Sequence, residues 1–369
     1  MQRIVHALIF LVIVTGVIQL ALTIPKPPLS KEVPTPTSVT KAKVFLKRPP
    51  QSYVLPQSQF VAQSFNNCGP ATLSMTLSMF GKYVSQEELA QEMRPFNNPF
   101  GGVDDKSIFA REFATYARKY GFESLHRPNG TIDLLKTFVA NDIPVVVRTL
   151  LNPYEDIGHF RIVRGYDSAK PGTVQNPAKQ NIIVDDSYNG PGIEIAYSDF
   201  LSMWQPFQYG YILVFPKEKQ DVVNSILDKE EDETVAWQSA LERAEKELKQ
   251  NPNNTYAQFN IAIAQYHLGS YENAVVSFEK AEPNLPPRML WYQYEPVLAY
   301  QKMKNYDRVF QLTDAILQNG NLAFSELYQV RGEVYKVLGN TEAAKQEFEN
   351  AVYYNHNFLT AKKALENMN

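Results

Sequence analysis

The segment QSFNNCGPAT, residues 63–72, carries the strongest structural signal in this chain. It contains Cys68, the only cysteine among 369 residues, directly before a stretch with helical periodicity. The amide N–H groups of a helix's first turn have no partner within the helix, and with the helix dipole they favour a thiolate over a thiol. A single cysteine can form neither an internal disulfide nor a paired-cysteine metal or redox site. Cys68 is therefore either a nucleophile or an inert buried thiol.

A thiolate nucleophile needs a base, which is usually a histidine. Two of the five histidines lie where helical and strand patterns mix: His126 in LHRPNG and His159 in IGHFRIVRGY. We expect His159 to be the base, because it begins a strand and a sheet holds an imidazole rigidly. His126 is the weaker candidate, because the adjacent Arg127 disfavours an imidazolium. Without Cys68, His159 would be read as an ordinary buried histidine.

Two adjacent acids, Asp185 and Asp186, end the next strand-like segment, IIVDDSYNG. Neighbouring strand residues face opposite sides of a sheet, so only one acid points toward His159, and periodicity leaves open which. Either is also compatible with an Asp that initiates the following Asn-Gly turn. Gln63 offers a side-chain amide that, with the backbone N–H of Cys68, would stabilise the oxyanion of a tetrahedral intermediate. The alternative for Gln63 is an exposed loop residue.

The order of these motifs resembles the papain-like peptidases of the bacteriocin-processing type, family thirty-nine of the cysteine peptidases, and especially its stand-alone "like" branch. The resemblance covers roughly residues 55–216. The motifs that carry it are, in chain order, Gln63, Cys68-Gly69-Pro70-Ala71, Gly158-His159-Phe160, Gly165-Tyr166-Asp167, Asp186 and Phe200-Leu201-Ser202-Met203-Trp204. The family implies a papain-like fold and cleavage of a peptide bond.

The resemblance also implies a role for each site residue. Cys68 matches the family's nucleophile, His159 its general base, Asp186 the residue that orients the base, and Gln63 its oxyanion donor. The family usually has Asp-Pro at the end of the third motif, where this chain has Asp186-Ser187. Matching Asp-Ser-Tyr to Asp-Pro-Tyr favours Asp186 over Asp185.

Residues 51–216, here called the mixed domain, are predicted to be α+β, because helical patterns come first and strand patterns follow. The predicted helices are 71–80, 85–93, 105–120 and 132–141, and the predicted strands are 143–149, 160–166, 181–185 and 210–215. The preceding residues, 25–50, are rich in Pro, Thr, Ser and Lys, which predicts an extended linker. Arg161 and Arg164 on the His159 strand could contact acidic substrate groups, but a solvated strand face is the commoner explanation.

Residues 233–369, here called the repeat domain, are predicted to be helical. Gly269-Ser270-Tyr271 and Gly339-Asn340-Thr341 are each followed by Ala, Phe and Ala at equal offsets, and Lys304-Asn305-Tyr306 lies halfway between them. This period of 35 resembles the tetratricopeptide repeat. The expected elements are a helix at 233–250, repeats near 255–288, 290–323 and 325–358, and a closing helix near 359–368. The alternative is an unrelated helical bundle.

The first residues predict export. Residues 4–24 are almost uninterruptedly apolar, about the length that spans a bilayer, and follow Arg3. We expect residues 1–24 to be an uncleaved membrane anchor, with a cleaved signal peptide as the alternative. The rest of the chain would then be extracytoplasmic, attached to the inner or plasma membrane, or secreted to the periplasm if the segment is cleaved.

Composition narrows the partners. The formal net charge of −3 and the absence of a basic stripe predict no nucleic-acid binding. The sequence has no metal-ligand cluster or phosphate-binding glycine loop, so we expect no cofactor and no metal. We expect a peptide or protein substrate, and a protein partner on the concave face of the repeats. The aromatic residues available to anchor that partner are Tyr256, Tyr292, Tyr294 and Tyr328, although most are expected to be packing residues.

Two functions from different classes fit these residues. The first is an exported, membrane-anchored cysteine peptidase whose repeats recruit a protein. The second is a catalytically silent, peptidase-like binding module that scaffolds an envelope assembly. All four catalytic positions are filled, which favours the enzyme. Transfer of the acyl group to another amine, rather than to water, is a third possibility. Processing of bacteriocin leaders is disfavoured, because that task belongs to domains fused to an exporter and facing the cytoplasm.

Overall fold

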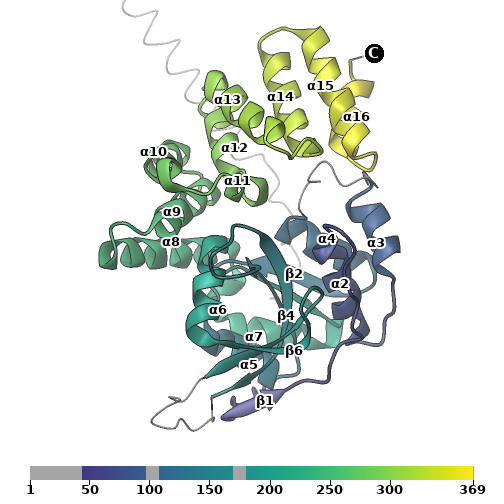
Figure 1. Cartoon of the computed structure of the whole chain (residues 1–369), viewed down its shortest axis with the longest axis vertical. Helices are drawn as coiled ribbons and strands as arrows, with labels where there is room; N and C mark the ends of the chain where they lie inside the picture. The colour runs from purple at the N-terminus through teal and green to yellow at the C-terminus, as the bar shows by residue number, and fades with distance from the viewer. Residues whose placement is uncertain (1–43, 97–107, 169–179, 369) are drawn as a thin grey trace, which may run out of the picture. The chain divides into compact units, whose positions relative to one another are not determined.

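The computed structural model describes residues 44–96, 108–168 and 180–368 (Figure 1). The expected membrane segment, residues 1–24, and most of the expected linker lie outside these ranges. Within them, no helix combines the length and the apolar character needed to cross a bilayer. The end of the expected linker is described, and there Lys47 binds the mixed domain through Asn141 and Asp142.

The described part of the mixed domain is built on a seven-stranded sheet in which all paired strands are antiparallel. The strand order is β2-β7-β3-β4-β5-β6, and β1 pairs with one end of β4. The strands are β1 (Ser52–Val54), β2 (Glu123–Arg127), β3 (Val145–Leu150), β4 (Gly158–Asp167), β5 (Asn181–Asp186), β6 (Gly190–Ala196) and β7 (Tyr211–Phe215).

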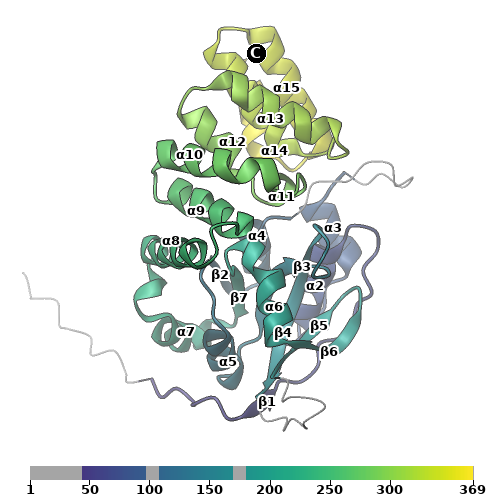
Figure 2. The same cartoon turned by 60° about the vertical axis from the view of Figure 1, so that its left-hand side comes forward.

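Helices cover both faces of this sheet because its central strands are apolar on both sides. In β3, Val146 packs against the helices of one face, while Val145 and Val147 pack against those of the other. Figure 2 shows α2 and α3 on one side of the sheet and α5 and α7 on the other. The first face carries α2 (Cys68–Ser78), α3 (Gln86–Met93) and α4 (Ala110–Lys119), and the second α5 (Ile132–Ala140), α6 (Tyr197–Trp204) and α7 (Gln220–Leu227).

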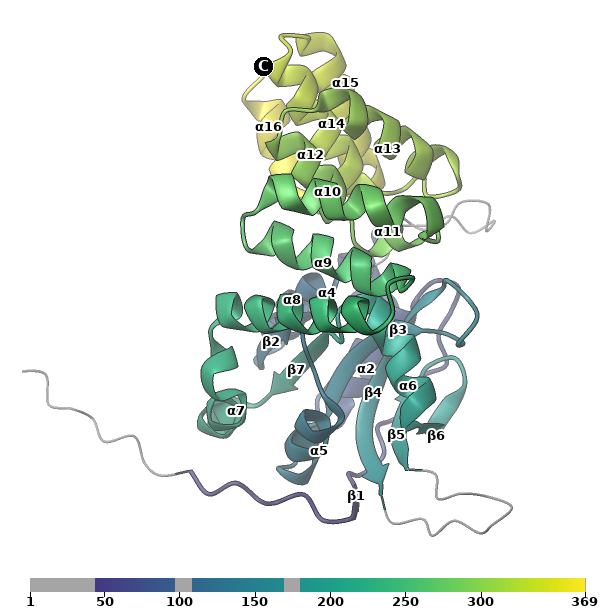
Figure 3. The ribbon, with the colours of Figure 1, turned by 90° about the vertical axis from the view of Figure 1, so that its left-hand side faces the viewer.

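The repeat domain is a succession of antiparallel helices (Figure 3), and Asn357 near its end donates to the carbonyls of Gln91 and Glu92 in α3. Its first helix, α8, lies beside the mixed domain, and α9 to α16 follow in chain order. The helices are α8 (Glu233–Gln250), α9 (Thr255–His267), α10 (Tyr271–Ala281), α11 (Met289–Tyr292), α12 (Glu295–Lys302), α13 (Tyr306–Gln318), α14 (Ser325–Val337), α15 (Thr341–Tyr354) and α16 (Leu359–Glu366). The predicted order of three repeats between an opening and a closing helix agrees with these elements.

The turn between the two helices of a repeat has the same backbone conformation in all three copies, although the middle copy lacks its glycine. Gly269 and Gly339 both have φ of 77°, a conformation that glycine adopts without strain. Lys304 occupies the equivalent position in the middle copy and adopts φ of 58°. The turn is therefore kept without its glycine, at the strain that a side chain brings to this region.

The two domains share one hydrophobic core. Leu150, Met203 and Phe207 of the mixed domain belong to the same buried cluster as the apolar residues of α9 to α16. At the start of β4, a Cβ atom on Gly158 would lie 3.1 Å from the ring of Tyr292 in α11. The absence of a side chain at Gly158 thus lets the repeat domain pack directly against the strand that carries His159.

The expected mixed domain followed by helical repeats is found, but some of its elements were not predicted. β1 is only three residues long, and β2 is polar enough to resemble a loop. β6 begins Gly190-Pro191-Gly192. An edge strand tolerates a proline because the backbone groups on its outer side do not hydrogen-bond to another strand. The charged stretch after β7 contains α7, which packs Val223 and Leu227 on the sheet.

Candidate active site

Cys68 is the first residue of α2, so its sulfur lies at a helix N-terminus as expected. The loop before it is fixed from two directions. The Arg94 guanidinium donates to Asn67 Oδ1 over 2.8 Å and also to the carbonyl of Asn66. Gln86 accepts from the Ser64 amide over 3.0 Å. These contacts hold the thiol at the helix terminus, partly exposed.

His159 faces Cys68 from β4, where it is paired with Thr149 of β3. Its Nε2 atom lies 2.9 Å from Asp186 Oδ1, and its side chain is close enough to the Cys68 thiol for each group to shift the pKa of the other. Because Nε2 faces the carboxylate, Nδ1 is the ring nitrogen that remains for the thiol. The structure therefore brings Cys68, His159 and Asp186 together in the order that the sequence predicts.

Asp186 is buried and carries more partners than an orienting carboxylate needs. Besides His159, its oxygens accept from the backbone amides of Tyr188 and Asn189 over 2.8 and 2.9 Å. Its Oδ2 atom also accepts from Arg161 Nε over 2.8 Å. Arg161 is buried and donates further to Thr149 Oγ1 and to the carbonyls of Leu150 and Leu151. Asp186 is thus fixed on both of its oxygens.

Asp185 points the other way and has a structural environment. It accepts from Arg164 Nε over 2.6 Å, from the Gly192 amide over 2.9 Å, and from both the amide and the hydroxyl of Ser58. These contacts join the N-terminal segment of the mixed domain to β4 and β6. The expectation that Arg161 and Arg164 lie on a solvated face is wrong, since each is paired with one of the two aspartates.

The charges in this cluster favour a thiolate–imidazolium pair. Burial would raise the pKa of the Cys68 thiol, but the hydrogen bond and charge of His159, followed by the charge of Arg148, lower it below its ordinary value. Burial would lower the pKa of His159, but hydrogen bonds to Asp186 and Cys68 raise it. Burial would also raise the pKa of Asp186, yet His159 and Arg161 hold it well below its usual range. Opposite shifts on Cys68 and His159 stabilise the ionic form that a nucleophile needs.

Gln63 is tied to this cluster through Ser187, the residue that follows Asp186. The buried Ser187 hydroxyl donates to Gln63 Oε1 over 2.9 Å, and the backbone N–H of Gln63 donates to the Ser187 carbonyl, also over 2.9 Å. With Oε1 engaged, Nε2 is the end of the amide that remains as a donor. Gln63 is therefore an oriented, half-buried side chain in the loop before Cys68.

Two segments of the chain match models of known protein families. Residues 51–212 match the model of the Peptidase_C39 like family. The mixed domain is therefore similar to this family. Residues 325–358 match a tetratricopeptide repeat model and form α14 and α15. No curated protein matches the chain.

Solved structures similar to this chain are of two kinds. A putative C39-like peptidase from Bacillus anthracis is 17% identical, with 46% of this chain and 99% of that one covered and a TM-score of 0.37. The peptidase domain of Streptococcus ComA, a bifunctional ABC transporter, is 17% identical, with 44% and 100% covered and a TM-score of 0.33. MamA from Desulfovibrio magneticus is 20% identical, with 42% and 82% covered and a TM-score of 0.34.

Arg148 is a charged neighbour of the C39-like site that the sequence did not single out. It is 7% exposed and lies over the ring of Phe160, 4.5 Å from its centroid, with the rings of Phe207 and Tyr292 within 6 Å. A buried guanidinium near a thiol stabilises the thiolate electrostatically. Arg148 is paired with Phe160 across β3 and β4, next to the pairing of Thr149 with His159. This position indicates that Arg148 is near the site, but only if the register of β3 with β4 is known.

Arg161 could have been found from the sequence. His159 and Arg161 are two residues apart on one strand and therefore share a face, which places a cation beside any carboxylate that meets His159. His126, the weaker candidate for the base, lies instead in β2, where burial lowers its pKa to about 3. In the described residues, no group of three or more His, Cys, Asp and Glu side chains is arranged to hold a metal.

The tyrosines expected to anchor a partner lie mostly in contacts within the chain. Tyr292 and Tyr328 are buried, Tyr292 against Phe207 and Tyr328 in a stack on Tyr354. Tyr294 packs on Phe109 from the mixed domain, with ring centroids 5.3 Å apart. At least this part of the repeat surface is occupied by the chain's own mixed domain.

Proposed function

We propose that this chain is a cysteine peptidase in which Cys68 is the nucleophile. The observation that carries the proposal is the continuous contact from Cys68 through His159 to Asp186, with pKa shifts that favour the ionic pair. The family match, a peptidase family, supports the same chemistry. A thiol without this environment would remain largely protonated at neutral pH.

The mechanism follows from the positions of the groups. The Cys68 thiolate attacks the carbonyl carbon of the scissile bond, and the oxyanion that forms is stabilised by the backbone N–H of Cys68 and by the Gln63 amide. The His159 imidazolium gives its proton to the leaving amine as the carbon–nitrogen bond breaks. His159 then takes a proton from water, whose oxygen attacks the thioester and releases the acid and the thiolate.

Asp186 and Arg161 support the base rather than touch the substrate. Asp186 orients the imidazole and stabilises its cationic form, as the acid of a catalytic triad does. Arg161 keeps Asp186 ionised and fixed, since it binds the carboxylate oxygen that His159 does not use. Arg161 is therefore a positioning residue in this proposal.

The proposal extends to location and partners. The apolar residues 4–24 and Arg3 support export with residues 1–24 as a membrane anchor, and the repeats support recruitment of a protein substrate or partner. Membrane fractionation of the full chain and of a chain lacking residues 1–24 tests the anchor. Retention of the shortened chain in the membrane fraction would contradict it.

The activity is tested by peptide profiling of the full chain with wild type and Cys68→Ala in parallel. Mass spectrometry of a diverse peptide pool should show new termini with wild type and none with Cys68→Ala. Product masses distinguish hydrolysis from transfer to an added amine. Absence of cleavage together with slow labelling of Cys68 by iodoacetamide at neutral pH would indicate the alternative, a silent binding module.

A further inference from the structure

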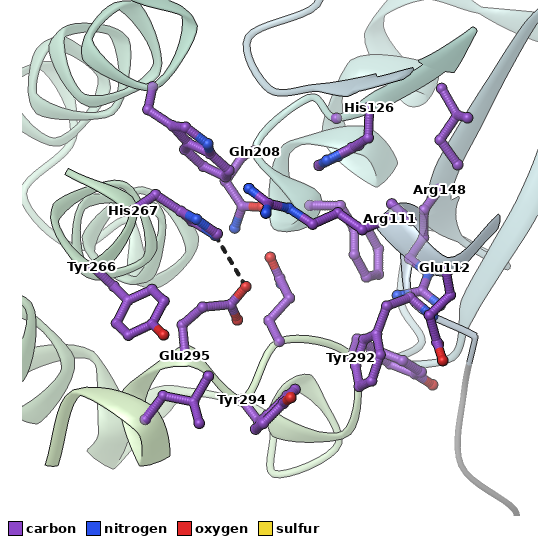
Figure 4. A pocket seen from close by; sticks show the side chains of 18 of the residues that line it. Arg111, Glu112, His126, Arg148, Gln208, Tyr266, His267, Tyr292, Tyr294 and Glu295 are labelled. Carbon is purple, nitrogen blue, oxygen red and sulfur yellow. Dashed lines mark hydrogen bonds and ion pairs between the residues drawn. The ribbon is translucent and has the colours of Figure 1, made fainter. Parts of the chain in front are cut away.

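A second polar site lies where the mixed domain meets the repeat domain (Figure 4). It is a cavity of about 620 Å³, within the range of small-molecule sites. Residues of α4, β2, β3 and the 3₁₀ turn Gln205–Phe207 line one side, and residues of α8, α9 and α12 line the other. We call it the junction cavity. Cys68, His159 and Asp186 do not line it.

Aromatic rings from both domains form much of its wall. His267 of α9 stacks on Trp237 of α8 with ring centroids 3.9 Å apart, and Tyr294 packs on Phe109. Such rings provide apolar area and a negative face that attracts ammonium groups. The aromatic residues in the lining are Phe109, Phe207, Trp237, Tyr266, Tyr271, Tyr292 and Tyr294.

Charged groups of both signs face this space. Arg111 and Arg148 come from the mixed domain, and Glu295 and Glu326 come from the repeat domain, while Glu112 adds a carboxylate on the mixed-domain side. Figure 4 shows the Arg111 side chain reaching between His126 and the His267–Glu295 pair. Arg111 also binds Glu233 of α8, and Glu295 Oε1 lies 3.2 Å from His267 Nε2. The cavity therefore presents cationic and anionic groups to one ligand.

Among the residues that the structure describes, no hydrogen-bond partner is found for two buried atoms of this wall, and these two atoms have opposite character. One is Nε of Arg148, a donor, and the other is Oε2 of Glu295, an acceptor. A buried charged group with unmet hydrogen-bonding capacity destabilises the fold unless a ligand or water satisfies it. A ligand that is only cationic or only anionic would leave one of these two walls uncompensated.

We propose that the junction cavity binds a short peptide with free termini. Its ammonium group would bind Glu295 between the rings of Tyr266 and Tyr294, and its carboxylate would bind the guanidinium groups of Arg111 and Arg148. The aromatic wall accommodates the side chains between the termini. Cys68, His159 and Asp186 do not line this site, although Arg148, whose charge lowers the pKa of Cys68, faces both.

Titration calorimetry on the full chain carrying Cys68→Ala tests this proposal, since that variant leaves a probe peptide intact. The probe is Gly-Phe-Gly with free termini, compared with the same tripeptide acetylated, amidated or blocked at both ends. We expect one-to-one binding of the free peptide, weakening at least about tenfold when both termini are blocked. Each single block should cause part of that loss.

Glu295→Gln, which removes one charge and keeps the shape of the side chain, should weaken binding of the free peptide at least about tenfold. Binding of the doubly blocked peptide should not change. Glu272→Gln, an exposed position on α10 outside the cavity, is the matched control and should have no effect. Equal binding of free and blocked peptides, full binding by Glu295→Gln, or no binding of the free peptide would each overturn the proposal. The blocked peptides keep the test valid even if Glu295→Gln folds poorly.

Discussion

The chain contains two pairs in which a histidine Nε2 atom contacts a carboxylate oxygen at a similar distance, but the surroundings of the two pairs differ. His159 and Asp186 are 2.9 Å apart with side chains 3% and 0% exposed, whereas His267 and Glu295 are 3.2 Å apart with side chains 15% and 21% exposed. Asp186 is held by Arg161 and two backbone amides, while Glu295 Oε2 has no partner within the described part of the chain. Only the first pair contacts a thiol. A histidine–carboxylate contact alone therefore does not define an active site.

The first pair has the features of the proposed catalytic site, and the second has those of the proposed binding site. A fully satisfied carboxylate holds an imidazole in one orientation, which a proton transfer requires. A carboxylate with an unused oxygen at a cavity of small-molecule size has capacity left for a ligand. Four predictions separate the two environments.

The largest effect is expected from Asp186→Asn, compared with Asp185→Asn as its matched control. Both acids are buried and bound to an arginine, so each substitution should lower the free energy of unfolding by about 3 kcal/mol. Only Asp186→Asn should lower kcat/KM, by at least about a hundredfold, because only Asp186 orients His159. The check is peptide cleavage per folded molecule. Equal losses in both variants would remove the catalytic role of Asp186.

The second-largest effect is expected from His159→Ala on the pH dependence of Cys68 alkylation. In the wild type, His159 lowers the pKa of Cys68, so the rate should rise to a plateau below the ordinary thiol range. His159→Ala removes the hydrogen bond and the positive charge, and burial then raises the pKa, so the midpoint should move to higher pH by at least about one unit. Iodoacetamide labelling across pH measures this. An unchanged midpoint would show that His159 does not act on the thiol.

A smaller effect is expected from Ser187→Ala, because the Ser187 hydroxyl orients the Gln63 amide. We expect kcat to fall about fivefold with little change in KM, which is less than removal of an oxyanion donor itself. Ser58→Ala is the matched control, since its buried hydroxyl binds Asp185 instead. It should reduce stability without reducing kcat. A drop in kcat for both would mean that Ser187 acts only through the fold.

The smallest effect should come from Glu295→Gln on stability. The His267–Glu295 pair is partly exposed, and such pairs contribute about 0–1 kcal/mol. The substitution also removes a charge whose second oxygen has no partner. The free energy of unfolding, measured with urea, should therefore change by less than about 1 kcal/mol, in contrast to the larger loss expected for Asp186→Asn. A loss comparable to that of Asp186→Asn would make this pair a structural one.

The sequence was informative about the reactive pair because a lone cysteine before a helix and a histidine at a strand start are local patterns. The choice between Asp185 and Asp186 needed the resemblance, because the end of β5 decides which side each faces. The roles of Arg148 and Ser187 depend on contacts between segments far apart in the chain, and local periodicity does not encode these. The junction cavity was unpredictable for the same reason, since its lining comes from residues 109 to 326.

Gly158 has a consequence for how this chain could exchange parts with others. A side chain there would meet Tyr292 at about 3 Å, so the strand end that presents His159 fits this repeat domain and needs its ring in place. Leu150, Met203 and Phe207 would likewise lose their apolar cover if the repeats were removed. The two family signatures in the sequence are therefore not two interchangeable modules. Recombination that moved one domain without the other would separate Gly158 from Tyr292.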